Sequence, residues 1–180
     1  MDLREIPRIH LAAILNEPGT KSAEGALRGA IGPEGQAIPL VGEADWKVTV
    51  SQTGGEFWLT GEIHGTALME CRRCLKPTPV PIDAYFQHLL RYQPGVEGVR
   101  LVEAPEEDLY YFGEPELDLS GFLYQAFALE MPLTALCRDD CAGLCPVCGA
   151  DLNETDCGHL AERERKTPFL ALEGLLKELG

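Results

Sequence analysis

Hydrophobic and polar residues alternate with a period of two over residues 46–92, in three successive runs. The first two runs are separated by Gly54-Gly55, a pair typical of a hairpin turn. The second run is long, and we expect Gly61 and Gly65 to mark a bend or bulge in it. The later runs share an apolar face made of Phe57, Leu59, Ile63, Ala67, Met69, Val80, Ile82, Ala84, Phe86, His88 and Leu90. Adjacent runs of this kind predict an antiparallel meander with one face on a core.

The period becomes 3.6 after Asp118, which is placed to cap a helix that Pro132 ends. A second helix is predicted over 168–179, since Thr167 is a suitable cap and Pro168 a suitable first residue. The stripe of the first helix consists of Leu119, Phe122, Leu123, Ala126 and Phe127. Stripes of this width pack on a core. We therefore expect an α+β protein in which about two helices cover the antiparallel β-meander.

The remaining stretches have weaker patterns. Gly and Pro interrupt 17–35, which indicates an extended loop, after a short apolar segment that suits either a strand or a helix. The acidic stretch 93–116 indicates a loop with one short strand at 110–112. The expected division of the chain is therefore a variable N-terminal segment (1–45), a sheet and helix core (46–136), a Cys-rich zinc-binding module (137–159) and a C-terminal helix packed on the core (160–180).

The charge balance restricts the partners. The chain has 180 residues with 15 Lys+Arg against 29 Asp+Glu, a net charge of −14. Such a surface repels a polyanion as a whole, so broad contact with nucleic acid is disfavoured and basic protein partners are favoured. No apolar run reaches the ~18 residues of a membrane span, and the first residues lack a signal-peptide pattern. We expect a cytoplasmic protein with no membrane or small-molecule partner.

Seven cysteines without a secretion signal indicate metal ligands, because the cytosol keeps thiols reduced and an odd count leaves one unpaired. Cys145 and Cys148, followed by Gly149, form a zinc knuckle, in which two Cys spaced by two residues turn back onto one ion. Cys71 and Cys74 form a second pair. Neither pair has the βαβ setting of a thioredoxin-like redox motif.

Together with His159 the cysteines make eight candidate ligands, enough for two tetrahedral sites. In the local partition, one zinc takes Cys145, Cys148, Cys157 and His159, and the other takes Cys71, Cys74, Cys137 and Cys141. A rival partition places Cys71 and Cys74 opposite Cys145 and Cys148, and a single zinc with spare thiols is a third arrangement. The surplus of ligands favours closed structural sites over a catalytic site with an open position. No catalytic triad or phosphate loop is present.

Arg72 and Arg73 lie inside the first Cys pair, and a basic run occupies 163–166. If zinc brings these regions together, a local basic patch can contact RNA phosphates despite the global charge. A solvated face paired with neighbouring acidic residues is the simpler interpretation.

Several ordered motifs resemble the YceD family, also called large ribosomal RNA subunit accumulation proteins. The first is Glu-Cys-Arg-Arg-Cys-Leu at 70–75, followed by Leu-Asp-Leu at 117–119, which opens a helix that ends in Met-Pro-Leu at 131–133. The series ends with Cys…Cys-Ala-Gly-Leu-Cys-Pro-Val-Cys-Gly-Ala-Asp-Leu-Asn over 137–153. The chain departs from many relatives at Cys157-Gly-His159, where they have Cys-x-Cys. Zinc accepts His for Cys.

The resemblance implies a bacterial, cytoplasmic, non-enzymatic factor needed for 23S rRNA accumulation and large ribosomal subunit assembly. It implies as partners a large-subunit ribosomal protein, with the small zinc-ribbon protein as candidate, or the 23S rRNA precursor. Some relatives lack most of the C-terminal cysteines, so one or two structural Zn²⁺ are expected to support stability here. The alternatives are a direct RNA-binding zinc protein acting through Arg72 and Arg73 and, less favoured, a metal-dependent hydrolase.

Overall fold

The computed structural model describes residues 6–102 and 109–159. The chain divides into two compact units. The first, which we call the sheet unit, comprises Met1–Met69 and Pro79–Leu133. The second, the Cys-rich unit, comprises Glu70–Thr78 and Thr134–Gly180.

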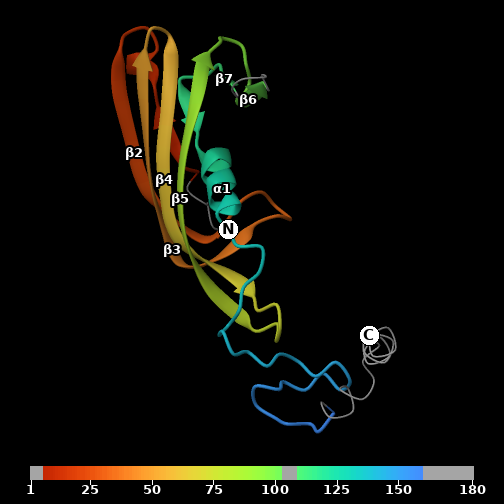
Figure 1. Cartoon of the computed structure of the whole chain (residues 1–180). Helices are drawn as coiled ribbons and strands as arrows, with labels where there is room; N and C mark the ends of the chain where they lie inside the picture. The colour runs from red at the N-terminus through yellow and green to blue at the C-terminus, as the bar shows by residue number, and fades with distance from the viewer. Residues whose placement is uncertain (1–5, 103–108, 160–180) are drawn as a thin grey trace, which may run out of the picture. The chain divides into compact units, whose positions relative to one another are not determined.

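The sheet unit is built on a six-stranded sheet (Figure 1) with the strand order β2-β3-β4-β5-β7-β6. Its strands are β2 (Gly19–Ile31), β3 (Ile38–Thr53), β4 (Glu56–Glu70), β5 (Pro77–Tyr92), β6 (Val99–Val102) and β7 (Leu109–Phe112). A two-stranded sheet pairs β1 (Arg8–His10) with β8 (Glu116–Asp118). The helical elements are the short 3₁₀ helix η1 (Ala12–Ile14) and α1 (Ser120–Leu129). The unit is therefore mostly β.

The alternating runs form β3, β4 and β5, as predicted. Gly54 and Gly55 both have positive φ, 63° and 88°, as the tight turn between β3 and β4 requires. The apolar face of β4 carries buried Phe57, Leu59, Ile63 and Ala67, and that of β5 carries buried Ile82, Ala84 and Leu90. The predicted helix stripe is also buried, at Leu119, Phe122, Leu123, Ala126 and Phe127. The core of the sheet unit lies between these two surfaces.

Three expectations about the strands were wrong: the sheet is not purely antiparallel, the stretch 93–116 holds β6 as well as the expected strand near 110–112, and 17–35 is not a loop. The sheet is mixed rather than antiparallel, because β7 pairs in parallel with β5. After β5 the chain passes through β6 at the sheet edge and returns as β7, which lies between them and buries Tyr110 and Phe112. The segment expected to be an extended loop is largely β2, which pairs with β3 from Gly19 to Ile31.

The glycines explain why β2 was missed. A Cβ on Gly25 would lie 3.0 Å from the Trp46 ring, so this glycine permits close packing inside a strand.

In β4, a Cβ on Gly61 would lie 2.3 Å from Cζ of Phe86. The irregularity of the β3–β4 pairing falls between Leu40 and Asp45 of β3, so the expected bulge belongs to the neighbouring strand.

One α-helix, α1, is present within residues 6–102 and 109–159. Oδ1 of Asp118 accepts a hydrogen bond of 2.7 Å from the backbone N–H of Ser120, which satisfies one of the free donors at the helix start. The second helix, predicted over 168–179, lies outside the described residues.

Candidate metal centres

The Cys-rich unit brings all eight predicted ligands into two groups of four. Cys71, Cys74, Cys137 and Cys141 form the first group, and Cys145, Cys148, Cys157 and His159 form the second. Within each group the candidate ligand atoms lie within 4.8 Å of one another. This arrangement is the local partition. Both groups are positioned to bind a metal ion.

Each group contains a Cys-x-x-Cys knuckle with the same backbone hydrogen bonds. In the first, the Cys71 N–H donates to the Lys76 carbonyl and the Leu75 N–H donates to the Cys71 carbonyl, both at 2.9 Å. In the second, the corresponding bonds join Cys145 to Ala150 and Gly149 to Cys145, both at 2.8 Å. The two knuckles are therefore the same local structure.

The sulfur separations fit a tetrahedral thiolate site. The Sγ atoms of Cys71 and Cys141 are 3.8 Å apart, and those of Cys74 and Cys137 are 3.6 Å apart. A tetrahedron with Zn–S bonds of about 2.3 Å has edges of about 3.8 Å. In the second group, Nδ1 of His159 lies 3.9 Å from Sγ of Cys145. All seven cysteines are free thiols, so no disulfide competes for these sulfurs.

The knuckle geometry favours the thiolate form of the first cysteine in each knuckle, whereas the pKa values of Cys74, Cys137 and Cys157 are raised. Backbone N–H groups of Cys137 and Cys74 directed at Cys71 lower the pKa of that thiol to about 6. In the second group, the N–H groups of Cys148 and Val147 lower the pKa of Cys145 to about 6. Because the thiolate is the metal ligand, each group holds one sulfur prepared for binding near neutral pH.

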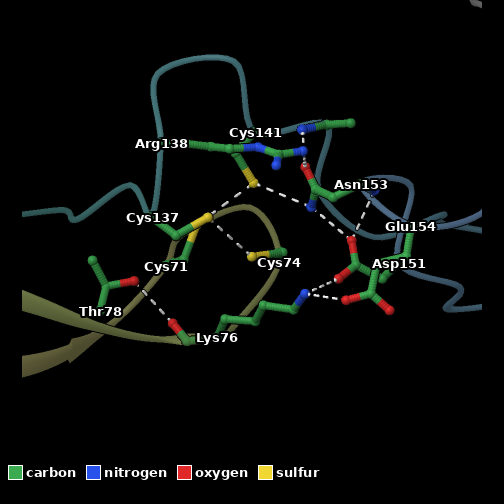
Figure 2. A network of polar contacts seen from close by, with 11 residues as sticks. Cys71, Cys74, Lys76, Thr78, Cys137, Arg138, Cys141, Asp151, Asn153 and Glu154 are labelled. Carbon is green, nitrogen blue, oxygen red and sulfur yellow. Dashed lines mark hydrogen bonds and ion pairs between the residues drawn. The ribbon is translucent and has the colours of Figure 1, made fainter.

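A network of polar contacts lies beside the first group (Figure 2) and reaches the loop between Cys148 and Cys157. Nζ of Lys76 forms ion pairs with Asp151 at 2.8 Å and with Glu154 at 2.6 Å. Lys76 and the backbone N–H of Asn153 together lower the pKa of Asp151 to about 2. The Asp151 carboxylate thus stays charged throughout the physiological range.

The two arginines of the first knuckle have different surroundings. Nη1 of Arg73 donates a hydrogen bond of 2.8 Å to the carbonyl oxygen of Cys141. The backbone N–H of Arg72 donates to the Ala135 carbonyl, and the residue is exposed. Both arginines are exposed, but the Arg73 side chain is also bonded to the backbone of the first ligand group. The basic run at 163–166 lies outside the described residues.

The structure groups the candidate ligands that the sequence predicted, but sequence reasoning missed the residues that hold these groups in place. Leu75 adopts a φ of 60°, the left-handed conformation that Gly149 adopts at the matching position with 73°. Asp151 and Asn153 hold their loop through an Asx turn, in which Oδ1 of Asp151 accepts from the Asn153 N–H at 2.9 Å. The spacing Asp-x-Asn was the available signal for that turn.

Fold and site together define a mostly β protein that carries two closed, four-ligand candidate metal centres. In the described ranges, no helix has the length and apolar character needed to cross a membrane. The model of the family described as "Large ribosomal RNA subunit accumulation protein YceD" matches residues 59–176. The chain therefore belongs to the YceD family, and the resemblance noted from its motifs is confirmed.

Curated relatives extend this finding. An uncharacterized protein of Mycobacterium tuberculosis is 31% identical over 134 residues, which cover 74% of this chain and 62% of the relative. The chloroplastic large ribosomal RNA subunit accumulation protein YCED homolog 1 of Zea mays is 30% identical over 132 residues, 60% of this chain and 45% of that protein. Its Arabidopsis thaliana counterpart is 29% identical over 146 residues, 67% of this chain and 44% of the relative. The matched part thus spans less than two thirds of these relatives' own lengths. No solved structure matches the chain significantly.

Proposed function

We propose that this protein is a non-enzymatic ribosome-biogenesis factor needed for 23S rRNA accumulation, and that it acts by binding. The observation that carries the proposal is membership of a family named for large ribosomal RNA subunit accumulation. The two ligand groups support it, because four protein ligands complete a tetrahedron and leave no position for substrate. The ion that suits three or four thiolates in this geometry is Zn²⁺, with a structural role.

The first experiment is the metal content of the full chain, purified without added metal and measured by mass spectrometry. Two zinc ions per chain are expected, with one lost in Cys71→Ser and one lost in Cys145→Ser. A single zinc that Cys71→Ser leaves in place would contradict the two-site proposal. Absence of zinc from the unmodified protein would overturn the metal assignment altogether.

The proposed partner is a basic protein of the large ribosomal subunit, with the small zinc-ribbon protein as first candidate. The net charge of −14 favours such a partner through complementary potentials. Binding measured by calorimetry should weaken as salt is raised, because screening reduces attraction between exposed charges. Binding that does not change with salt would argue against charge complementarity. Depletion of the protein in its native host should lower 23S relative to 16S rRNA, and an unchanged ratio would refute the biogenesis role.

Direct binding of pre-rRNA is the alternative, and the exposed position of Arg72 in the first knuckle favours it. Reversing the charge of both arginines should abolish binding of a 23S precursor fragment with zinc retained. Because Arg73 bonds to Cys141, the cleaner variant is Arg72→Glu, with Arg72→Lys as its matched control. Unchanged RNA binding in Arg72→Glu would eliminate this alternative. A cytoplasmic location remains part of the proposal, and the names of the plant relatives place those proteins in the chloroplast.

A further inference from the structure

Asn153 lies in the loop between two ligands of the second group, yet its side chain contacts the first group. Its Nδ2 donates to Sγ of Cys141 at 3.5 Å (Figure 2) and to Oδ1 of Asp151 at 2.6 Å. Its Oδ1 accepts from the Ala142 N–H and from Nη2 of Arg138, both at 2.8 Å. An amide has two donors and two acceptor positions, and all four are used here. This fixes the orientation of the amide, so that a donor faces the sulfur.

The contacts of Asn153 join segments that belong to different candidate metal groups. Arg138 and Ala142 each lie next to a cysteine of the first group, whereas Asn153 is carried between Cys148 and Cys157 of the second. When an ion binds the second group, it closes the loop that carries Asn153. The donor is then already in place at Cys141.

A hydrogen bond to a metal-bound thiolate stabilises the charged form of that ligand and holds its orientation. Hydrogen bonds to charged groups are stronger than neutral ones. Loss of an outer hydrogen-bonding partner typically lowers metal affinity about 10–100-fold. The physical setting is favourable, because Cys141 is 1% exposed and water does not replace the missing donor easily.

We propose that Asn153 is a positioning residue that couples the two metal sites, so that filling the second group increases the affinity of the first. Because coupling between two binding sites is reciprocal, filling the first group strengthens the second by the same factor. The inference rests on the proposed metal sites and adds to them a residue that is not a ligand.

The test is a Co²⁺ titration of the metal-free full chain, followed by native mass spectrometry and visible absorption. Native masses count the ions on each molecule, and the absorption spectrum distinguishes four-sulfur from three-sulfur coordination. At half saturation, the unmodified protein should contain more molecules with no ion, and more with two ions, than independent binding at two sites would give. Molecules with one ion should be correspondingly fewer. In Asn153→Ala, the one-ion form should accumulate, because binding of the first ion no longer favours binding of the second.

Two variants separate the donor from the rest of the side chain. Asn153→Asp keeps an oxygen for Ala142 and Arg138 but has no donor for Cys141, so it should weaken the first site at least as much as Asn153→Ala, about 10–100-fold. Thr155→Ala is the matched control in the same loop, because Thr155 is exposed and its backbone N–H, which alanine keeps, donates to the Asp151 carbonyl. It should leave both affinities unchanged.

A double-mutant cycle completes the experiment. Cys148→Ser removes the second site, so adding Asn153→Ala to it should weaken the first site far less than Asn153→Ala does alone. Additive effects would overturn the coupling, as would a first-site affinity unchanged in Asn153→Ala. A general loss of folding would also overturn it. It would lower the affinity for the first ion bound as well as for the second, whereas loss of the coupling lowers only the affinity for the second ion bound. If the unmodified protein binds no metal, the proposed metal sites fail instead, and the two failures are distinguishable.

Discussion

Removal of metal should unfold the Cys-rich unit and leave the sheet unit folded. The buried cluster of the Cys-rich unit consists of Cys71, Cys74 and Cys141, with Leu136 and Leu144 partly buried against it. Its buried side chains are thus three of the ligands themselves. The two leucines contribute at most about 1.5–3 kcal/mol each by burial, whereas one structural zinc contributes about 10–16 kcal/mol. Without the ions, the burial of these side chains does not compensate for the conformational entropy that the chain loses on folding.

The sheet unit has a different basis for its stability. Its core contains large side chains that are fully buried without any ligand, such as Phe57, Phe112 and Phe127. Chelation therefore gives an internal comparison within one molecule. Hydrogen exchange followed by mass spectrometry, with and without a chelator, measures the protection of backbone amides in both units in the same sample.

The expected result is a selective loss of protection. The amides of Leu144, Gly149 and Leu152 donate backbone hydrogen bonds inside the Cys-rich unit, and they should exchange at least about a thousandfold faster after chelation, which corresponds to about 4 kcal/mol. Amides of β3 and β4 should keep their protection. Chelator saturated with zinc beforehand is the control, and added zinc should restore the protection. Equal loss in both units, or none in the Cys-rich unit, would refute the reasoning.

Three further predictions concern single positions. Nδ1 of His64 donates to Oδ1 of Asp83 at 2.8 Å, and this hydrogen bond raises the pKa of the imidazole. Its contribution to the stability of the fold should be complete below the unfolded pKa of about 6.5 and disappear as pH rises through the folded pKa. Proton NMR should show that Asp83→Asn lowers the pKa of His64, and an unchanged titration would contradict the prediction. Gly61→Ala should lower the free energy of unfolding of the sheet unit by about 1–3 kcal/mol in a denaturant titration, because its Cβ would lie 2.3 Å from Phe86, and full stability would show that the ring moves at no cost. Leu75→Val should lower the zinc affinity of the first metal site about tenfold, because a β-branched residue is disfavoured at a φ of 60°. Leu75→Asn should keep the affinity, since Asn tolerates this conformation, and equal zinc affinity of the two variants would refute this explanation.

The sequence pattern predicted the elements whose residues pack on a core and failed where packing does not impose a pattern. In β4 and α1, one face must be apolar, and that requirement is visible as a period of 2 or 3.6. β2 has no such signature because most of its residues are exposed at the sheet edge. Its Gly25 indicates a loop by composition, although it is required by the ring of Trp46. The parallel pairing of β7 depends on its position between β5 and β6 in the sheet. The local sequence pattern does not encode that position.

The candidate ligands could be recognised in the sequence because cysteine and histidine are uncommon and their spacing has a direct chemical meaning. Their partition could not be, for an energetic reason. The sulfurs of Cys74 and Cys137 come together although 63 residues separate them. Each doubling of loop length adds only about 0.6 kcal/mol to the cost of closure. Sequence distance therefore barely disfavours one pairing of the four Cys-rich segments relative to another.

What selects the observed partition is visible in the contacts around the sulfurs. The Leu144 N–H donates to the Arg73 carbonyl at 3.0 Å, and a Cβ on Gly143 would lie 3.0 Å from the same oxygen. The two knuckles are thus joined through backbone beside their ligands, at a point where a glycine with a φ of 80° allows the approach. Each knuckle belongs to its own group of four candidate ligands, and Lys76 and Asn153 connect the loops around the two groups. These contacts, which only the folded chain reveals, therefore accompany the observed grouping of the candidate ligands. For this reason the variants of Asn153 test the design of the metal centres more directly than removal of any cysteine.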